Sequence, residues 1–345
     1  MQLDRWPAVL AAREFVKSRR GRVVVASHND VDGLASLVIL SRALRGCGSE
    51  PLPLPGRRGE HVHQDGMRDR IRALDPEALV VLDMGSRSGA ILDGVPTLVI
   101  DHHVPRGSGP DGALFVNGYD REPVAPTSVL AWAVCRELPG TALSAWLAAL
   151  GAVADLGTAA PFADLVGVVP KGTSWTKAVS LLNAARRAPE DDVHTALQVL
   201  EAASSAQEIS AGRVPGVAQL EQYRQAVQAE VARCSRIAPR RVGPAALIRF
   251  SSAAQVHPLI AVRWSGRLAP AIVIAANDAF LPGRVNFAVR SASDVDLVAW
   301  LRSLSFTPSP SAEFANGHPR ATGGSLPISD FERFVEVVSH APAPG

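Results

Sequence analysis

Three short apolar segments near the start of the chain constrain its fold more than any other feature. They occupy residues 22–27, 78–82 and 97–100. Continuous β-branched and aliphatic runs of this length are typical of strands buried on both faces of a parallel sheet. Apolar residues at helical spacing lie between and after them, at residues 34–44, 64–74, 126–138 and 143–154. This alternation predicts an α/β domain with a mostly parallel sheet.

Acidic and histidine side chains follow each of the three segments directly. In chain order they are His28, Asp30, Asp32, Asp83, Asp101, His102 and His103. The carboxyl ends of parallel strands meet at one edge of a sheet, where open α/β folds bind their ligands. A further acid, Asp155, ends the apolar segment at 143–154. We therefore expect five carboxylates and three imidazoles to meet in one crevice.

This set of side chains suits a pair of divalent cations. Two metal ions about 3.5–4 Å apart can bind the attacking and leaving oxygens of a phosphoryl displacement. Carboxylates together with imidazoles favour Mn²⁺, with Mg²⁺ or Co²⁺ as alternatives. Gly33, directly after Asp32, permits close approach of the backbone. An isolated Asp-Val-Asp-Gly segment is usually only a turn, but the recurrence of acids at each strand end favours a metal site.

The composition excludes several other classes of function. Over 345 residues the formal net charge is only +2, which excludes tail-driven binding of nucleic acid and leaves only local basic patches. The three cysteines, Cys47, Cys135 and Cys234, are too far apart for a zinc knuckle or a disulfide framework. The first residues lack the apolar core of a signal peptide, and no apolar segment is long enough to span a membrane. We expect a cytoplasmic protein without a membrane partner.

The second half of the chain predicts a helical segment followed by a smaller domain. Helical patterns cover residues 171–203 and 217–236. Strand patterns then return at 246–250, 259–264, 269–275 and 284–289, followed by a glycine-rich turn at 316–324 and a helix from Ser329. We therefore expect a catalytic domain at residues 1–200, a helical connection at 201–239 and a smaller α/β domain with a mixed sheet at 240–340.

These motifs resemble the DHH phosphoesterase superfamily, and within it the RecJ-type single-strand exonucleases. Its motifs match here, in chain order, His28-x-Asp30-x-Asp32-Gly33, Asp83, Asp101-His102-His103 and Gly151 to Asp155. The segment from Asn183 to Arg187 is similar to the Asn-Ala-Ala-Gly-Arg segment of RecJ-type enzymes. Residues 286–291 and 316–324 resemble the substrate-contacting strand and the Gly-Gly-His motif of the DHH-associated C-terminal domain.

The resemblance implies a role for each matching residue. His28, Asp30 and Asp83 would bind one Mn²⁺ ion, and Asp32, Asp83, His102 and Asp155 would bind a second, with Asp83 shared. Asp83, Asp101 and His103 would be the catalytic residues, with His103 donating to the scissile phosphate and Asp101 orienting an imidazole. The substrate-binding residues would be Asn183, Arg187, Arg290, Gly317, His318, Gly323 and Gly324.

Three functions stay open on the sequence. A RecJ-like exonuclease would bind single-stranded DNA or RNA. Its candidate basic contacts, which could equally form solvated helix faces, are Arg19, Arg20, Arg22, Arg57, Arg58, Arg68, Arg70, Arg72, Arg240 and Arg241. Trp175 and Tyr223 are either stacking platforms or packed side chains. The aromatic content of only 5 %, and no OB-like segment, favour instead a nanoRNase-type hydrolase of short oligonucleotides or cyclic dinucleotides. An inert scaffold in DNA replication or repair is less favoured, because every proposed metal position holds a suitable side chain. The oligomeric state is left open.

Overall fold

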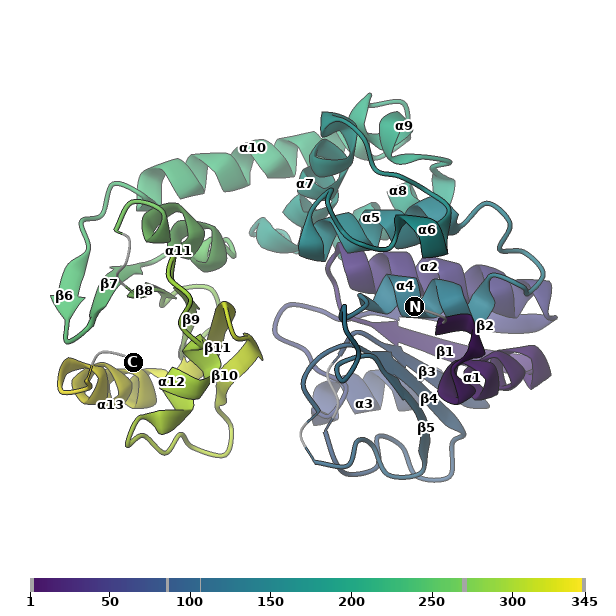
Figure 1. Cartoon of the computed structure of the whole chain (residues 1–345), viewed down its shortest axis with the longest axis horizontal. Coiled ribbons are helices and arrows are strands. Elements are labelled where there is room, and N and C mark those ends of the chain that lie inside the picture. Colours follow the sequence, from purple (N-terminus) through teal and green to yellow (C-terminus); the bar gives the residue numbers. More distant parts are fainter. Residues whose placement is uncertain (1–2, 85–86, 106, 269–271, 343–345) are drawn as a thin grey trace. The chain divides into compact units, whose positions relative to one another are not determined.

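The computed structural model describes residues 3–84, 87–105, 107–268 and 272–342 (Figure 1). Contacts divide the chain into two compact units. The first comprises Met1–Arg186 and Glu190–Gln222, and the second comprises Arg187–Pro189 and Tyr223–Gly345. The division falls inside α10 (Val217–Cys234), the long helix that the sequence predicts at residues 217–236.

The first unit is built on a five-stranded sheet with the order β2-β1-β3-β4-β5, and every pairing in it is parallel. Its strands are β1 (Gly21–Ser27), β2 (Ser49–Pro55), β3 (Ala78–Leu82), β4 (Thr97–Asp101) and β5 (Ala113–Asn117). The predicted parallel α/β domain is therefore confirmed. β2 is not expected from the sequence, because it contains three prolines. It is an edge strand, where a missing N–H is tolerated.

Helices cover both faces of this sheet (Figure 1). On one face, Met67 and Ile71 of α3 (Asp65–Arg72) pack in a core with Val24, Leu79 and Val99. The opposite face carries α1 (Pro7–Ser18), α2 (Val31–Gly46) and α4 (Thr127–Cys135). The remaining helices of the unit are η1 (Leu3–Arg5), α5 (Ala145–Leu156), α6 (Ala163–Val166), α7 (Thr173–Arg187), α8 (Val193–Ala202) and α9 (Ala206–Ser210).

The carboxyl ends of β1, β3 and β4 are in register, which decides where the following residues lie. Ser27 is paired with Leu82, and Leu82 with Ile100. The backbone contacts continue past the strands, since the amide of His28 donates to the carbonyl of Leu82 (3.0 Å). The amide of Asp83 donates in the same way to Ile100 (3.0 Å). The polar residues that follow the three strands are therefore neighbours.

The second unit contains a mixed six-stranded sheet with the order β10-β11-β9-β8-β7-β6. Its strands are β6 (Arg240–Val242), β7 (Ala245–Phe250), β8 (Ile272–Asn277), β9 (Arg284–Arg290), β10 (Glu313–His318) and β11 (Ala321–Pro327). In the described part of this sheet only β7 and β8 pair in parallel. Phe287 of β9 packs against Phe331 and Phe334 of α13 (Ile328–Ser339), and α12 (Leu297–Ser303) completes this core. The expected mixed sheet is confirmed.

Two sequence expectations for the second unit are wrong. The strand expected at 259–264 is instead part of α11 (His257–Ser265). A short apolar run does not distinguish strand from helix, and Pro258 in the first helical turn favours the helix. The turn expected at 316–324 is a hairpin of β10 and β11, with only Pro319 and Arg320 between the strands. Residues 269–271 of the strand expected at 269–275 lie outside the described residues.

The glycines of this hairpin explain why it looks like a turn in the sequence. A Cβ at Gly323 would lie 2.2 Å from the carbonyl oxygen of Phe287, and one at Gly324 equally close to that of Glu313. Both positions therefore need glycine because neighbouring strands approach closely. None of the helices in the described ranges combines the length and the hydropathy that a membrane span requires.

Candidate metal centre

The loop between β1 and α2 brings His28 and Asp30 together. Asp30 caps α2, and its Oδ1 accepts a hydrogen bond from the amide of Gly33 (3.1 Å). A Cβ at Gly33 would lie 2.4 Å from the carbonyl oxygen of His28, so only glycine lets the first helical turn pack here. Nδ1 of His28 then lies 2.8 Å from Oδ2 of Asp30.

Asp83, directly after β3, lies between two histidines. Its Oδ2 is 3.4 Å from Nδ1 of His28, and its Oδ1 is 3.4 Å from Nε2 of His102. The residue is 3 % exposed and has a positive φ of 60°, which is uncommon for a residue other than glycine. A carboxylate that contacts a separate imidazole through each oxygen has the geometry expected of a shared ligand.

The residues after β4 form a compact turn around the carboxylate of Asp101. This buried group accepts from the amides of His102 (2.7 Å) and His103 (3.2 Å), and Nδ1 of His103 lies 2.8 Å away. Asn117, at the end of β5, donates to the carbonyl of His103 (3.0 Å). Nε2 of His102 is 3.6 Å from Oδ2 of Asp155, which comes from α5. Asp101 therefore holds both histidines in place.

The first turn of α4 also belongs to the site, although the sequence analysis did not single it out. The amides of Thr127 and Ser128 donate to Oδ2 and Oδ1 of Asp32, at 2.7 and 3.0 Å. The hydroxyl of Thr127 donates to Oδ1 of Asp83 (3.1 Å). The sequence predicts a helix here, and its polar start was the only available clue.

The charges of the site are strongly coupled. Burial alone would lower the pKa of His28, but the carboxylates of Asp30 and Asp83 have the larger effect and raise it to about 10. Burial is likewise outweighed at His103, where Asp101 raises the pKa to about 10. Burial dominates at His102 and lowers its pKa, so this ring is neutral at neutral pH.

The carboxylates separate into two groups. Burial, followed by the charge of Asp83, raises the pKa of Asp32 well above its usual range; burial and Asp32 do the same for Asp155. Burial would also raise the pKa of Asp30, but His28 and then Arg186 hold it well below its usual range. Asp101 has a lowered pKa because His103 outweighs burial. Asp32 and Asp155 thus repel neighbouring carboxylates, a repulsion that bound cations would remove.

Among the described residues, three groups of side chains have ligand atoms close enough to share a cation. They are His28, Asp30 and Asp83; Asp83, His102 and His103; and Asp32, His102 and Asp155, each with ligand atoms within 4.8 Å of one another. Carboxylate oxygens and imidazole nitrogens suit Mn²⁺ or Mg²⁺. At His28 a cation would replace the proton that Asp30 and Asp83 favour on the ring. The structure thus brings together all six residues predicted as metal ligands, and these residues fit divalent cations.

The predicted substrate-binding residues divide between the two units. Asn183 is buried on α7, and its Oδ1 accepts from Nε of Arg186 (3.1 Å). Arg187, at the end of α7, groups with the second unit. Arg290 ends β9, where its Nη1 donates to the carbonyls of Val289 (2.8 Å) and Thr322 (3.2 Å). Gly317 lies on β10, and Gly323 and Gly324 on β11; the side chain of His318 is outside the described residues.

The basic residues around the start of β1 lie away from the metal centre. Arg19, Arg20 and Arg22 flank the amino end of a seven-residue strand, whereas His28 follows its carboxyl end, about 20 Å along the strand. Arg22 forms an ion pair with Asp75, and Arg20 donates to the carbonyls of Lys17 and Arg19. The geometry indicates helix capping and surface pairing for this segment, not a strand-binding channel.

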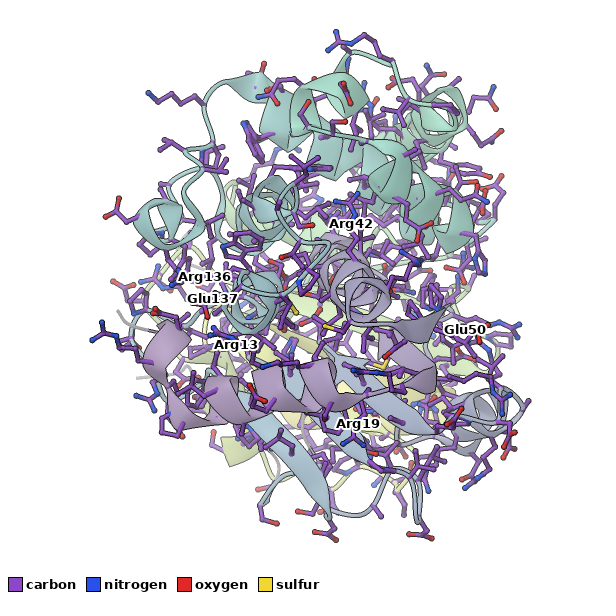
Figure 2. All side chains as sticks on the ribbon, turned by 90° about the vertical axis from the view of Figure 1, so that its right-hand side faces the viewer. Arg13, Arg19, Arg42, Glu50, Arg136 and Glu137 are labelled. Atoms are coloured by element: carbon purple, nitrogen blue, oxygen red, sulfur yellow. The ribbon has the colours of Figure 1, made fainter. Side chains whose placement is uncertain are left out.

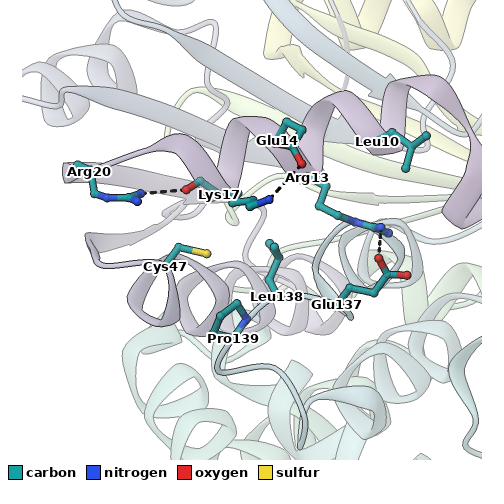
Figure 3. A pocket seen from close by; sticks show the side chains of 9 residues that line it. All are labelled: Leu10, Arg13, Glu14, Lys17, Arg20, Cys47, Glu137, Leu138 and Pro139. Atoms are coloured by element: carbon teal, nitrogen blue, oxygen red, sulfur yellow. Dashed lines mark hydrogen bonds and ion pairs between the residues drawn. The ribbon is translucent and has the colours of Figure 1, made fainter.

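A pocket of about 460 Å³ lies beside this segment, between α1 and residues 137–139. Arg13 reaches from α1 to Glu137 (Figures 2 and 3). Lys17 lies 3.8 Å from Glu14 in the same pocket (Figure 3). The cations Arg13 and Lys17 are thus paired, and no residue of the metal centre is among those that line it.

The expected stacking platforms are not at the surface. Trp175 is 4 % exposed and Tyr223 is 8 % exposed. Both aromatics are therefore packed side chains, the second of the two alternatives that the sequence leaves open. Trp175 is on α7 and Tyr223 is on α10. Each helix is polar overall but buries one apolar face, and the aromatic ring lies on that face.

Comparison with known proteins agrees with this architecture. Residues 22–154 match the DHH family, N-terminal domain, and no curated protein matches the sequence. The chain is similar to a manganese-bound exonuclease RecJ, with 21 % identity and a TM-score of 0.66 over 98 % of this chain and 96 % of that one. RecJ from Thermus thermophilus in complex with Mn²⁺ gives 22 % identity and a TM-score of 0.72, over 99 % of this chain.

The match to the Thermus protein covers 57 % of that chain, so the present chain spans less than two thirds of its length. The DHH domain of a member of the s1p family of ribosomal proteins is also similar, with 14 % identity and a TM-score of 0.61, over 97 % of this chain and 90 % of that one. At these identities the solved structures show a shared fold, and this is the two-part α/β fold that the motifs predict.

Proposed function

Residues 22–154 of this chain belong to the DHH family, and on this premise we propose that the protein is a metal-dependent phosphodiesterase acting on single-stranded nucleic acid. The proposal rests on one observation above the others. Asp83 lies between His28 and His102, with Asp30 and Asp155 contacting the same histidines. Such a set has the donors that two divalent cations need for phosphoryl displacement.

The metal-binding role of these residues can be divided as the motifs suggest. His28, Asp30 and Asp83 hold one cation, and Asp32, His102 and Asp155 hold the other together with Asp83. When bound, Mn²⁺ or Mg²⁺ polarises the phosphate and lowers the pKa of water, which makes water an effective nucleophile at neutral pH. His102 is suited to ligation because its neutral ring offers a lone pair.

His103 has a different task in the proposal. In the metal-free chain Asp101 raises the pKa of His103 to about 10, so the ring holds a proton at neutral pH. A charged imidazolium beside the metal ligands can donate a hydrogen bond to a phosphate oxygen and stabilise the charge that develops there. Asp101 orients this ring through the 2.8 Å contact with Nδ1. We assign Arg187 and Arg290 of the second unit to binding of substrate phosphates, with Asn183, Gly317, His318, Gly323 and Gly324 as further contacts.

The length of the substrate has two candidates. Fold similarity to RecJ supports an exonuclease that degrades long single strands. The burial of Trp175 and Tyr223 favours a hydrolase of short oligonucleotides or dinucleotides, because neither ring can stack on a base. The short-substrate candidate therefore has a specific structural argument in its favour.

One set of assays tests the proposal. End-labelled DNA and RNA, each long and 5′-phosphorylated, and a dinucleotide are incubated with Mn²⁺, with Mg²⁺ and with EDTA. We expect metal-dependent release of nucleotides, absent in Asp83→Asn. A long-strand enzyme loses affinity steeply with salt, whereas a dinucleotide hydrolase does so weakly. No hydrolysis of any of these substrates with either metal would overturn the proposed function.

A further inference from the structure

Two consecutive residues of α4 donate three hydrogen bonds to two carboxylates of the metal centre. The amides of Thr127 and Ser128 reach the two oxygens of Asp32, at 2.7 and 3.0 Å. The hydroxyl of Thr127 reaches Oδ1 of Asp83, at 3.1 Å. Both donor residues are fully buried, so water does not compete for these bonds.

The bonds to Asp32 use groups that a helix cannot satisfy itself. The first amides of an α-helix have no acceptor within the helix. At α4 the preceding residue is Pro126, which forms no side-chain cap. Asp32, which is distant in sequence, takes the place of the missing cap. Its carboxylate is thereby held across the amino-terminal end of α4. Each carboxylate oxygen has two lone pairs, so one bond to each leaves a lone pair on each for a cation.

The hydroxyl bond places Thr127 between two ligand groups. Its amide holds Asp32 while its Oγ1 holds Asp83. Asp83 has a φ of 60°, a backbone conformation that residues other than glycine rarely adopt and that persists only when the surroundings enforce it. A donor on Oδ1 opposes rotation of this carboxylate away from His28 and His102.

The amino-terminal end of α4 is itself held in place by α5. The hydroxyl of Ser128 donates to the carbonyl of Ala148 (3.2 Å). At Gly151, one turn further along α5, a Cβ would lie 2.2 Å from Oγ of Ser128 and 2.5 Å from Oδ1 of Asp32. The absence of a side chain at Gly151 therefore lets α5, α4 and Asp32 come together.

We propose that Thr127 is a positioning residue that sets the orientation of Asp32 and Asp83 for metal binding, with the first turn of α4 as its rigid support. This inference rests on the proposed metal centre, and it adds a residue outside the four motifs. Thr127 needs no contact with substrate. Its effect is on how tightly the chain binds a cation before any substrate is present.

Calorimetric titration of the full chain with Mn²⁺ alone tests the assignment. Thr127→Val keeps the shape of the side chain but removes the donor, and we expect Mn²⁺ affinity to fall about 10–100-fold. Thr127→Ser keeps the hydroxyl and should restore most of the affinity. Thr141→Val is the matched control, because Thr141 is equally buried but its hydroxyl donates only to the carbonyls of Cys135 and Leu138. It should lose stability and keep the affinity.

Each outcome is decisive. A folded Thr127→Val protein that binds Mn²⁺ as tightly as the wild type would overturn the positioning role. If valine at 127 prevents folding, Thr127→Ala removes the same donor with a smaller side chain and carries the same expectation. A wild-type chain that binds no Mn²⁺ would overturn the proposed function as well, so the two failures are distinguishable.

Discussion

Nε2 of His102 lies 3.4 Å from Oδ1 of Asp83, although the two residues follow different strands. Nδ1 of His28 lies equally far from the other oxygen of the same carboxylate. The distances make Asp83 the residue on which the geometry of the whole centre depends.

Asp83→Asn should therefore remove activity almost completely. The amide keeps the shape but loses the charge that both cation positions need, and we expect kcat to fall by about three orders of magnitude. Asp75→Asn is a matched control, because Asp75 also has a positive φ but pairs with Arg22 at the surface. Turnover in Mn²⁺ measures both, and retention of more than a few per cent of activity in Asp83→Asn would contradict a shared ligand.

The pair of Asp101 and His103 should behave as a unit. Asp101→Asn removes the charge that raises the pKa of His103, and we expect kcat to fall about 10–100-fold. His103→Ala should be more damaging, and the double variant no worse than His103→Ala alone. Exposed Asp93→Asn is the control. Additive losses in the cycle would show that the two side chains act independently.

Arg290→Ala should raise KM by about tenfold and change kcat less, because the proposed role of Arg290 is to bind substrate phosphate without taking part in bond breaking. Arg284→Ala is the matched control at the other end of β9, where its guanidinium contacts Ser325 (2.7 Å). Steady-state kinetics on a dinucleotide separate the two parameters. An unchanged KM would remove Arg290 from the substrate site.

Gly151→Ala should damage both folding and metal binding. The added Cβ would overlap Oγ of Ser128 and Oδ1 of Asp32, and we expect a loss of about 1–3 kcal/mol in the free energy of unfolding. Gly66→Ala on α3 is the control, since nothing lies within 4 Å of its added Cβ. Denaturant titration and Mn²⁺ calorimetry give the two readouts. Normal affinity in Gly151→Ala would mean that α5 tolerates a shift away from Asp32.

His63 should make the fold sensitive to acid. Burial, Arg87 and Arg68 lower its pKa from 6.5 to about 4, so the folded chain takes up this proton later than the unfolded chain. The contribution of neutral His63 to the free energy of unfolding is fully present above pH 6.5, the pKa of this group in the unfolded chain. It is lost as pH falls from 6.5 towards 4. Between neutral pH and about pH 5, we expect His63→Gln to lose about 1 kcal/mol less free energy of unfolding than the wild type, a figure that allows for solvent screening. Thermal melting at the two pH values measures this difference. Exposed His340→Gln is the control; equal acid sensitivity in His63→Gln and the wild type would exclude His63 as the cause.

The sequence was sufficient to predict that the proposed ligands are neighbours, because they follow the strands that form the sheet. His28, Asp83 and His102 each come directly after a run of buried apolar residues, so predicting the strands also predicts the site. Strand register was the one further requirement, and the pairing of Ser27, Leu82 and Ile100 supplies it.

The contribution of Thr127 could not be predicted in this way. A threonine at the start of a helix is usually an ordinary capping residue. Its bonds to Asp32 and Asp83 depend on how α4 packs on α2, α5 and β4, which no local pattern encodes. The prediction of a strand at 259–264 was wrong for a related reason. A buried helix and a buried strand have the same apolar composition, so a short apolar segment does not distinguish them.

The ligands at the carboxyl edge of the sheet come from four stretches of chain that are separate until the protein folds. An unfolded chain has no such arrangement, so a cation held there is bound by the native state only. By mass action, each tenfold rise in free Mn²⁺ above its dissociation constant then adds about 1.4 kcal/mol per bound ion to the free energy of unfolding. For the proposed metal centre, scarcity of Mn²⁺ would therefore shorten the lifetime of the folded protein as well as lower the proposed activity.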